Sequence, residues 1–268
     1  MSKKNMPVNR DFLKSNLFTK EGRMSISSDQ MKKKPAPPLQ KPYPKDVSLL
    51  NLIQPEDFQI GNIPLIDVIN KRRSHRRFTK EQFTLEELSF LLWATQGVQY
   101  LIGGGNAIWR TVPSGGARHP FETYLYLSQV DGLQPGLYRY LSIEHKLYLL
   151  RTEGEISSIF NKTLVAKAPI VFIWTAIPYR TEWRYGDFSY KTIVQETGHV
   201  CQNLYLASEA IGAGCCAVGA YNQEIIDEFL GVDGEDEFTV YTARVGKIKQ
   251  SSKSLQRMAE TLHGYRTR

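Results

Sequence analysis

Apolar positions along this chain follow a helical period in some segments and a strand period in others. The clearest helical segment is TLEELSFLLWATQG, where one face is formed by Leu85, Leu88, Leu92 and Thr95. Thr84 and Glu87 form a capping box at its start, and Gly97 is a typical stop at its end. The pattern therefore predicts a helix between Thr84 and Gly97.

Four segments have the composition and length of strands. ETYLYLS, GLYRY and KLYLLR follow one another, and the first two are separated by the turn residues Asp131, Gly132, Pro135 and Gly136. This arrangement predicts an antiparallel meander. The fourth segment, APIVFIWTAI, is a continuous apolar run, which is typical of a strand buried on both faces and predicts a central position in the sheet.

The remaining segments add helices and strands in mixed order. A long helix is predicted over residues 190–211, because apolar and small residues recur along one face and Gly212 follows. Shorter helices are expected at PLIDVINKRRS, at residues 155–163 and at NQEIIDEFL, and two further strands at CCAVGAY and FTVYTARVGK. This order indicates an α+β fold, with helices flanking a central mixed or antiparallel sheet.

Positive charge is concentrated at the N-terminus. The 268-residue chain has a net charge of +7, but residues 1–46 hold 11 of its 34 Lys and Arg and only 4 of its 27 Asp and Glu. We interpret residues 1–47 as a basic, Pro- and Lys-rich arm that is extended and not packed, and residues 48–268 as one domain. The remainder of the chain is balanced in charge, so a nucleic-acid groove is not indicated.

Membrane and metal functions are also disfavoured. The basic leader lacks the apolar run of a signal peptide or a membrane span, so we expect a cytoplasmic protein. Cys201, Cys215 and Cys216 have neither CxxC spacing nor a nearby set of His ligands. We therefore expect no metal site, and we expect reduced, packed thiols, with a redox role as the less favoured alternative.

A candidate ligand loop lies between helical and strand-like sequence, in RTVPSGGARHP. Small side chains and free backbone N–H groups let a flat, anion-bearing ligand approach the main chain. This chemistry suits a cofactor site. A structural turn explains the same residues, because Pro-Ser-Gly-Gly is good turn sequence in any context.

Four motifs in order give the chain a resemblance to a known superfamily. KRRSHRRF, PSGGARHP, GAGCCAVGA and RVGK resemble the FMN-dependent nitroreductase-like superfamily. Within it, RTVPSGGARHPFE, GLYRY and WRYGDFSY resemble the SagB-type dehydrogenases, which oxidise azoline rings to azoles in ribosomal peptide natural products. The resemblance covers residues 65–249 and implies a nitroreductase-like fold and an intertwined homodimer with FMN at the subunit interface.

The resemblance implies that one group of residues holds the tail of FMN. Arg72 and Ser74 would bind this tail, with Arg73 and Arg76 close by and Lys247 reaching the phosphate from the last strand. Guanidinium groups and a hydroxyl suit a phosphate and a ribityl chain. A solvated basic helix end, favoured by the helix dipole, is the alternative.

A second group of residues is implied to contact the flavin ring. The residues that resemble the loop along the isoalloxazine are Pro113, Ser114, Gly115 and Gly116. Val218 and Gly219 match the segment whose amide N–H points at flavin N5, where a donor stabilises the charge that develops during hydride transfer. The glycines lack GxGxxG spacing, so NAD(P)H, if used, would be a transient electron donor.

Candidate catalytic residues lie in RYGDFSY, just before the long helix: Arg184, Tyr185 and Tyr190. In the SagB-type family a Lys-Tyr pair serves in proton removal, and Arg184 stands at the Lys position. Arginine stays protonated, so Tyr185 would act alone or the role differs. Both tyrosines could instead cap an aromatic core. For Glu196 and His199, a local pair used in packing or a dimer contact is favoured over catalysis.

Three functions remain open from the sequence. The first is an FMN-dependent azoline-type dehydrogenase acting on a peptide or small molecule, the second an NAD(P)H-dependent reductase of nitro compounds or quinones, and the third a flavin-binding protein without turnover. All three need the same cofactor site. They differ in the redox partner, which is the substrate in the first, nicotinamide in the second and absent in the third.

Overall fold

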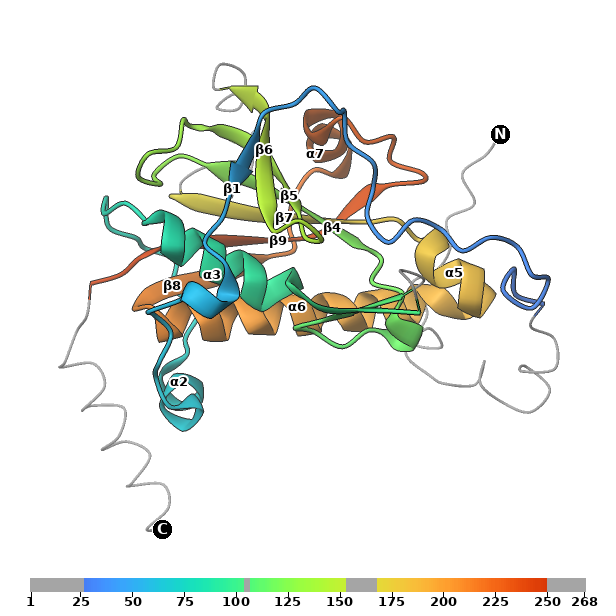
Figure 1. Ribbon diagram of the computed structural model, residues 1–268. Helices are drawn as coiled ribbons and strands as arrows, with labels where there is room; N and C mark the ends of the chain where they lie inside the picture. The colour runs from blue at the N-terminus through green and yellow to red at the C-terminus, as the bar shows by residue number, and fades with distance from the viewer. Residues whose placement is uncertain (1–26, 104–106, 153–167, 250–268) are drawn as a thin grey trace, which may run out of the picture.

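A seven-stranded antiparallel sheet forms the centre of the protein, for which the computed structural model describes residues 27–103, 107–152 and 168–249 (Figure 1). The strand order is β1-β6-β5-β4-β7-β9-β8. These strands are β1 (Leu49–Asn51), β4 (Phe121–Leu127), β5 (Gly136–Leu141), β6 (Lys146–Thr152), β7 (Ile170–Ala176), β8 (Ala213–Val218) and β9 (Phe238–Lys247). A separate hairpin joins β2 (Val98–Ile102) to β3 (Ala107–Arg110).

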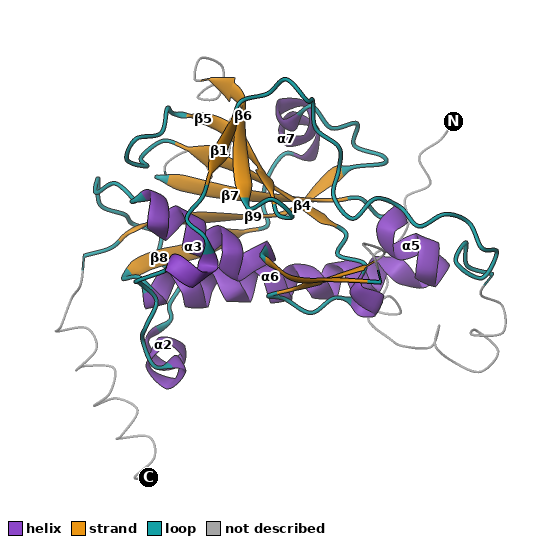
Figure 2. Cartoon of the chain, viewed as in Figure 1, coloured by secondary structure: helices purple, strands orange, loops and turns teal. Residues whose placement is uncertain are grey.

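Helices cover both faces of this sheet (Figure 1, Figure 2). On one face lie α3 (Leu85–Gln96) and α6 (Ser189–Ala210), and on the other lies α7 (Gln223–Leu230); α2 (Leu65–Lys71) and α5 (Tyr179–Tyr185) pack against α6. Successive strand residues point to opposite faces. Leu125 and Phe172 therefore join the core with α3 and α6, whereas Tyr124 and Ile173 join a second core with α7.

Most of the predicted elements are confirmed. The capping box of Thr84 and Glu87 opens α3, which ends before Gly97. The meander is β4, β5 and β6, and the apolar run is β7, which is buried at every residue and lies between β4 and β9. The predicted long helix is α6. The α+β fold is thus confirmed, and the helix predicted over residues 155–163 lies outside the described residues.

The sequence patterns did not predict β1, the β2–β3 hairpin or α5. In α5 the buried side chains are Arg180, Thr181 and Trp183, so a largely polar face points inward and no apolar period marks the helix. The hairpin exposes Tyr100 and Trp109, so its apolar residues do not mark a buried face. Each of these elements is defined by tertiary contacts and not by its own pattern.

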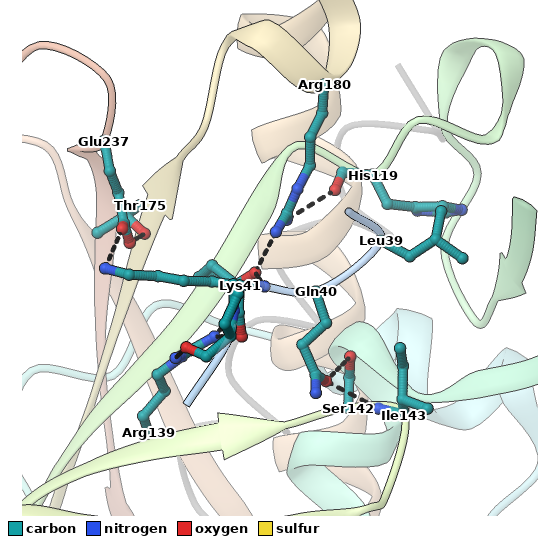
Figure 3. A network of polar contacts seen from close by, with 12 residues as sticks. Leu39, Gln40, Lys41, His119, Arg139, Ser142, Ile143, Thr175, Arg180 and Glu237 are labelled. Carbon is teal, nitrogen blue, oxygen red and sulfur yellow. Dashed lines mark hydrogen bonds and ion pairs between the residues drawn. The ribbon is translucent and has the colours of Figure 1, made fainter. Parts of the chain in front are cut away.

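Residues 28–43, which we call the strap, are packed against the fold, contrary to the unpacked arm that the sequence predicted. Figure 3 shows Lys41 of the strap at the centre of a polar network, with Arg139 and Arg180 approaching it. The Lys41 N–H donates to Glu122 at 2.7 Å, and its ammonium pairs with Glu237. Arg139 donates to the main-chain oxygens of Lys41 and Pro42. Because these bonds involve main-chain atoms of the strap, no side-chain pattern indicates them.

The carboxylate of Glu122 is the buried centre of this network. It pairs with Arg139 at 3.0 Å and with Arg180 at 2.5 Å, and its side chain is only 4% exposed. Burial alone would raise the pKa of Glu122, but the guanidinium groups of Arg180 and Arg139 outweigh burial and lower it. The group therefore stays ionised in the folded protein.

We predict that Glu122→Gln lowers the free energy of unfolding by about 3–5 kcal/mol, because it leaves two buried guanidinium groups without their counterion. Urea unfolding at neutral pH measures this change. Glu224→Gln, on the exposed face of α7, is the matched control and should change stability by less than about 0.5 kcal/mol.

The pH dependence adds a second test of Glu122. Its lowered pKa contributes stability that is present above the unfolded-state pKa and is lost as the pH falls through the folded-state pKa. The difference between wild type and Glu122→Gln should therefore shrink on acidification. A difference that is constant with pH would show that the pair contributes nothing through ionisation.

Candidate functional site

The basic end of α2 meets the end of β8 at Tyr205. The Tyr205 hydroxyl lies 3.1 Å from the Ser74 hydroxyl and accepts a hydrogen bond from the Ala217 N–H at 2.9 Å. The Arg72 guanidinium lies over the same ring, 5.4 Å from its centroid. We call these four residues the Tyr205 cluster. The chain is held in this path because the His75 N–H donates to the Cys215 oxygen.

The predicted ligand loop, Pro113–Gly116, packs on the other half of α6. The Gly115 N–H donates to the Glu196 carboxylate at 2.6 Å, and the His119 N–H donates to the Ser114 hydroxyl at 2.9 Å. We call Pro113–Gly116 and Glu196 the Gly115 cluster. These bonds fix the loop at two neighbouring residues, so its conformation is determined by tertiary contacts as well as by turn sequence.

The structure brings the predicted catalytic residues Arg184 and Tyr185 against this loop. Gly116 has φ +61°, and a Cβ added there would lie 2.5 Å from Cδ of Arg184 and 2.9 Å from the Tyr185 hydroxyl. A side chain at this position would therefore collide with both residues. The Arg184 guanidinium stacks on the Tyr185 ring, with 5.6 Å to the centroid. Tyr190, at the start of α6, is 49% exposed and does not cap a core.

The two clusters lie on opposite sides of α6. Glu196 and Tyr205 are nine residues apart, which is two and a half helical turns and about 14 Å along the axis. In Figure 2, β8 lies toward one end of α6 and α5 at the other. One chain therefore presents the predicted tail and N5 contacts on one side of α6 and the predicted ring loop Pro113–Gly116 on the other.

Lys247 is engaged by residues of its own chain and lies far along the sheet from Val218, the residue implied to contact flavin N5. Its ammonium pairs with Glu87 of α3 and lies over the Phe83 ring, 5.0 Å from the centroid. It is paired in the sheet with Ala213, five residues from Val218 along β8, or about 17 Å at the usual rise of a strand. Its contacts thus give no support to a phosphate role, which stays a prediction.

The other predicted tail-binding residues are accessible. Arg73 donates to the main-chain oxygens of Asn70 and Arg72, and Arg76 is exposed. In the described part of the chain neither they nor Arg72 form an ion pair with a carboxylate. Three guanidinium groups near one helix end are therefore available to an anion.

Glu196 is a site residue that the sequence did not place in the cluster. The sequence suggested a local pair with His199, but the carboxylate bonds to the Gly115 N–H and is only 4% exposed. Burial raises its pKa, while the Gly115 N–H and the Ser114 hydroxyl act in the opposite direction. A carboxylate within one long helix has no sequence signal for such a distant partner, so only the fold reveals it.

The structure also bears on the cysteines, on metal binding and on membrane-spanning helices. The three cysteines are free and buried, and burial raises the pKa of Cys201 to about 12, as expected of packed thiols. Within residues 27–103, 107–152 and 168–249 no three His, Cys, Asp or Glu side chains are grouped as a metal site. None of the described helices combines the length and hydropathy needed to cross a bilayer.

Comparisons with known proteins identify the family. The model of the Nitroreductase family matches residues 69–247, so the chain belongs to this family of flavin-dependent oxidoreductases. The chain is 37% identical over 177 residues to "Putative nitroreductase MJ1384" of Methanocaldococcus jannaschii, covering 65% of this chain and 87% of that protein. The predicted nitroreductase-like fold and oxidoreductase class are confirmed.

Two further proteins are similar to this chain. The trifolitoxin-processing protein TfxB of Rhizobium leguminosarum is 28% identical over 138 residues, which cover 48% of this chain and 37% of that protein. A crystal structure from Ralstonia eutropha, described as "a putative nitroreductase", superposes with a TM-score of 0.63 at 26% identity and covers 81% of this chain and 100% of its own.

We predict that Gly116→Ala weakens flavin binding at least about tenfold, because the new methyl group displaces Arg184 and Tyr185 from the loop. Gly132→Ala is the matched control, since Gly132 also has positive φ, +71°, but has nothing within 4 Å of the added Cβ. Both variants should lose roughly 1–2 kcal/mol of stability from backbone strain. Titration of apoprotein with FMN, followed by flavin fluorescence, separates them; equal affinities would contradict a ligand role for the loop.

Proposed function

We propose that this protein is an FMN-dependent oxidoreductase of the SagB type, which transfers hydride between a substrate and flavin N5. The observation that supports this most directly is the Tyr205 cluster. There the basic helix end and the end of β8, which the resemblance assigns to the tail and to N5 of FMN, are joined through one hydroxyl group. Ser74 and Ala217, which are 143 positions apart in the sequence, are thus held together, as the proposed FMN site requires.

The residues present fit FMN in their chemistry. Three guanidinium groups, those of Arg72, Arg73 and Arg76, form no ion pair with a carboxylate among the described residues. They are therefore suited to bind a phosphate dianion. The exposed Ser74 hydroxyl suits the ribityl chain. In the Gly115 cluster, the lack of side chains at two consecutive positions lets Arg184 and Tyr185 approach the main chain of the loop that resembles the one along the isoalloxazine.

In this assignment the chain's own residues bind and orient, and the cofactor supplies the redox chemistry. FMN, when bound, would accept or deliver a hydride. The main-chain N–H groups at Val218 and Gly219 would donate to N5, where negative charge develops. The Arg184 guanidinium, stacked on Tyr185, would position an acceptor group of the substrate without taking up a proton, because arginine stays protonated.

A homodimer explains how the two clusters form one site. They lie on opposite sides of α6, so the Tyr205 cluster of one protomer and the Gly115 cluster of its partner would face the same flavin. Exposed apolar side chains are available for such an interface: Leu65, Ile66 and Ile69 on α2, and Tyr190 and Val194 on α6. Patches of this kind mark association surfaces in soluble proteins.

Azoline oxidation on a peptide is supported by the similarity to the trifolitoxin-processing protein and by the RYGDFSY segment. A reductase that takes electrons from NAD(P)H is the second candidate, favoured by the similarity to the Methanocaldococcus protein. A flavin-binding protein without turnover is the third. The redox partner distinguishes these three functions.

The first experiment is an absorbance spectrum of the purified protein, with mass identification of the released chromophore. We expect FMN at one per protomer. Under anaerobic conditions an azoline-containing peptide should then bleach the flavin, and dioxygen should restore its colour. Rapid bleaching by NADH or NADPH would favour the reductase, and no bleaching by any donor would favour the third function. Protein that does not bind added FMN would contradict all three.

If each FMN site is formed by two protomers, a heterodimer of two different defective chains should contain one intact site. Arg72→Ala and Gly116→Ala homodimers should each bind FMN at least about tenfold more weakly. The first variant removes a contact to FMN and the second distorts the loop, and each change should cost about 1.5–3 kcal/mol of binding free energy. A heterodimer purified by two tags combines both defects in one site and leaves the other intact. We expect tight binding of one FMN per heterodimer. Uniformly weak binding would show that each site belongs to a single chain.

A further inference from the structure

We propose that Glu196 carries the proton that is exchanged with the substrate at the flavin site, an assignment that rests on the proposed function. Oxidation of a substrate by two electrons removes a hydride and a proton. FMN, when bound, would take the hydride, so the protein must provide a base for the proton. Arg184 is a poor base, so in the segment before α6 only the phenol of Tyr185 could take the proton, and a carboxylate is a better base than a phenol near neutral pH.

The geometry of the Gly115 cluster points to Glu196. One carboxylate oxygen, Oε1, accepts the Gly115 N–H at 2.6 Å and anchors the side chain beside the ligand loop. The other oxygen, Oε2, is buried and has no hydrogen-bond partner in the described part of the chain. A buried acceptor without a partner costs free energy, so this oxygen is suited to a proton or to a group brought by a ligand.

The surroundings of Glu196 favour exchange of that proton. The loop presents the Ser114 hydroxyl and the Gly115 N–H, and a Cβ added at Gly115 would lie 3.6 Å from Cε2 of Tyr185 and 3.4 Å from Oε1 of Glu196. The basic side chains nearby are Arg184 on α5, which stacks on Tyr185, and the exposed His199 on α6, which acts against burial on the pKa of Glu196. No described cation forms an ion pair with Glu196. Burial therefore dominates and moves its pKa up, toward the working pH where a base or acid is most effective.

The step balances in both directions. In oxidation, one C–H bond of the substrate breaks with its electron pair leaving as hydride to FMN, a second bond to hydrogen releases a proton to Oε2 of Glu196, and a double bond forms. In reduction, Oε2 returns the proton while hydride is delivered to the double bond. In both cases Oε1 keeps its bond to Gly115, so the loop stays in place while the carboxyl changes protonation state.

Glu196→Gln tests this role, because the amide oxygen can still accept the Gly115 N–H but the side chain cannot carry the proton. Glu209→Gln, on the same helix and outside both clusters, is the matched control. Three readouts are needed for each variant and for wild type. They are flavin content by absorbance, the pH profile of turnover, and the infrared carbonyl stretch of protonated carboxyl groups in the cofactor-free protein during a pH titration.

We expect Glu196→Gln to keep its flavin and its affinity for FMN, and to lose about 10²–10⁴-fold in turnover together with one ionisation of the pH profile. The titrating carbonyl band of wild type should be absent from Glu196→Gln and present in Glu209→Gln. Glu196→Asp, which restores a carboxyl group, should recover part of the lost turnover.

Stability gives a check that does not depend on flavin. A raised folded-state pKa contributes stability below the unfolded-state pKa that is lost as the pH rises through the folded-state pKa. Wild type should therefore lose free energy of unfolding relative to Glu196→Gln on alkalinisation, and Glu209→Gln should follow wild type.

Three results would overturn the assignment. The first is turnover of Glu196→Gln within about threefold of wild type with an unchanged pH profile. The second is loss of flavin from Glu196→Gln, which would make Glu196 only a support for the loop. The third is a titrating carbonyl band that is the same in Glu196→Gln as in wild type. Wild-type protein without flavin would instead contradict the proposed function, and the infrared and stability readouts would still decide whether Glu196 binds the proton.

Discussion

The ion pairs of Glu122 with Arg139 and Arg180 connect the sheet to the short helix α5 and to the strap. Glu122 lies on β4, Arg139 on β5 and Arg180 on α5, and the same carboxylate accepts the Lys41 N–H of the strap. The Arg180–Glu122 ion pair fixes the short helix α5 to the sheet. Because buried charges need partners, apolar side chains could replace this ion pair only if Glu122, Arg139 and Arg180 were all exchanged and repacked together. The strap also holds α5 from outside, since the Gln30 N–H donates to the Trp183 oxygen.

This constraint reaches the candidate site through two further hydrogen bonds. Arg180 donates to the main-chain oxygen of His119, and the His119 N–H donates to the Ser114 hydroxyl in the ligand loop. His119 stays neutral in this position, because burial and the neighbouring Arg110 lower its pKa to about 3. The strap, α5 and the loop are therefore parts of one buried polar assembly. Its cost in desolvation is offset only when every member is in place, which favours a single arrangement of the site.

The sequence predicted elements whose own pattern determines them, and it failed where partners are distant in the chain. The capping box of α3 and the apolar strand β7 carry their signals locally. The packing of the strap depends on main-chain atoms of Lys41, and the position of Glu196 depends on a loop 81 residues away, so neither has a local signal. The ligand loop was found as a motif, but its contact with α6 and α5 needed the fold.

If Glu196 carries the proton, as we propose, an arginine at position 184 is compatible with the proposed chemistry. Arg184 keeps its charge and is satisfied by the Tyr185 ring, so it can bind an acceptor group without competing for a proton. Glu196 is held by a neutral main-chain donor and not by a cation, so its protonation is free to change. In our proposal, a fixed positive charge on Arg184 and a titratable carboxyl on Glu196 divide substrate binding and proton exchange between two residues.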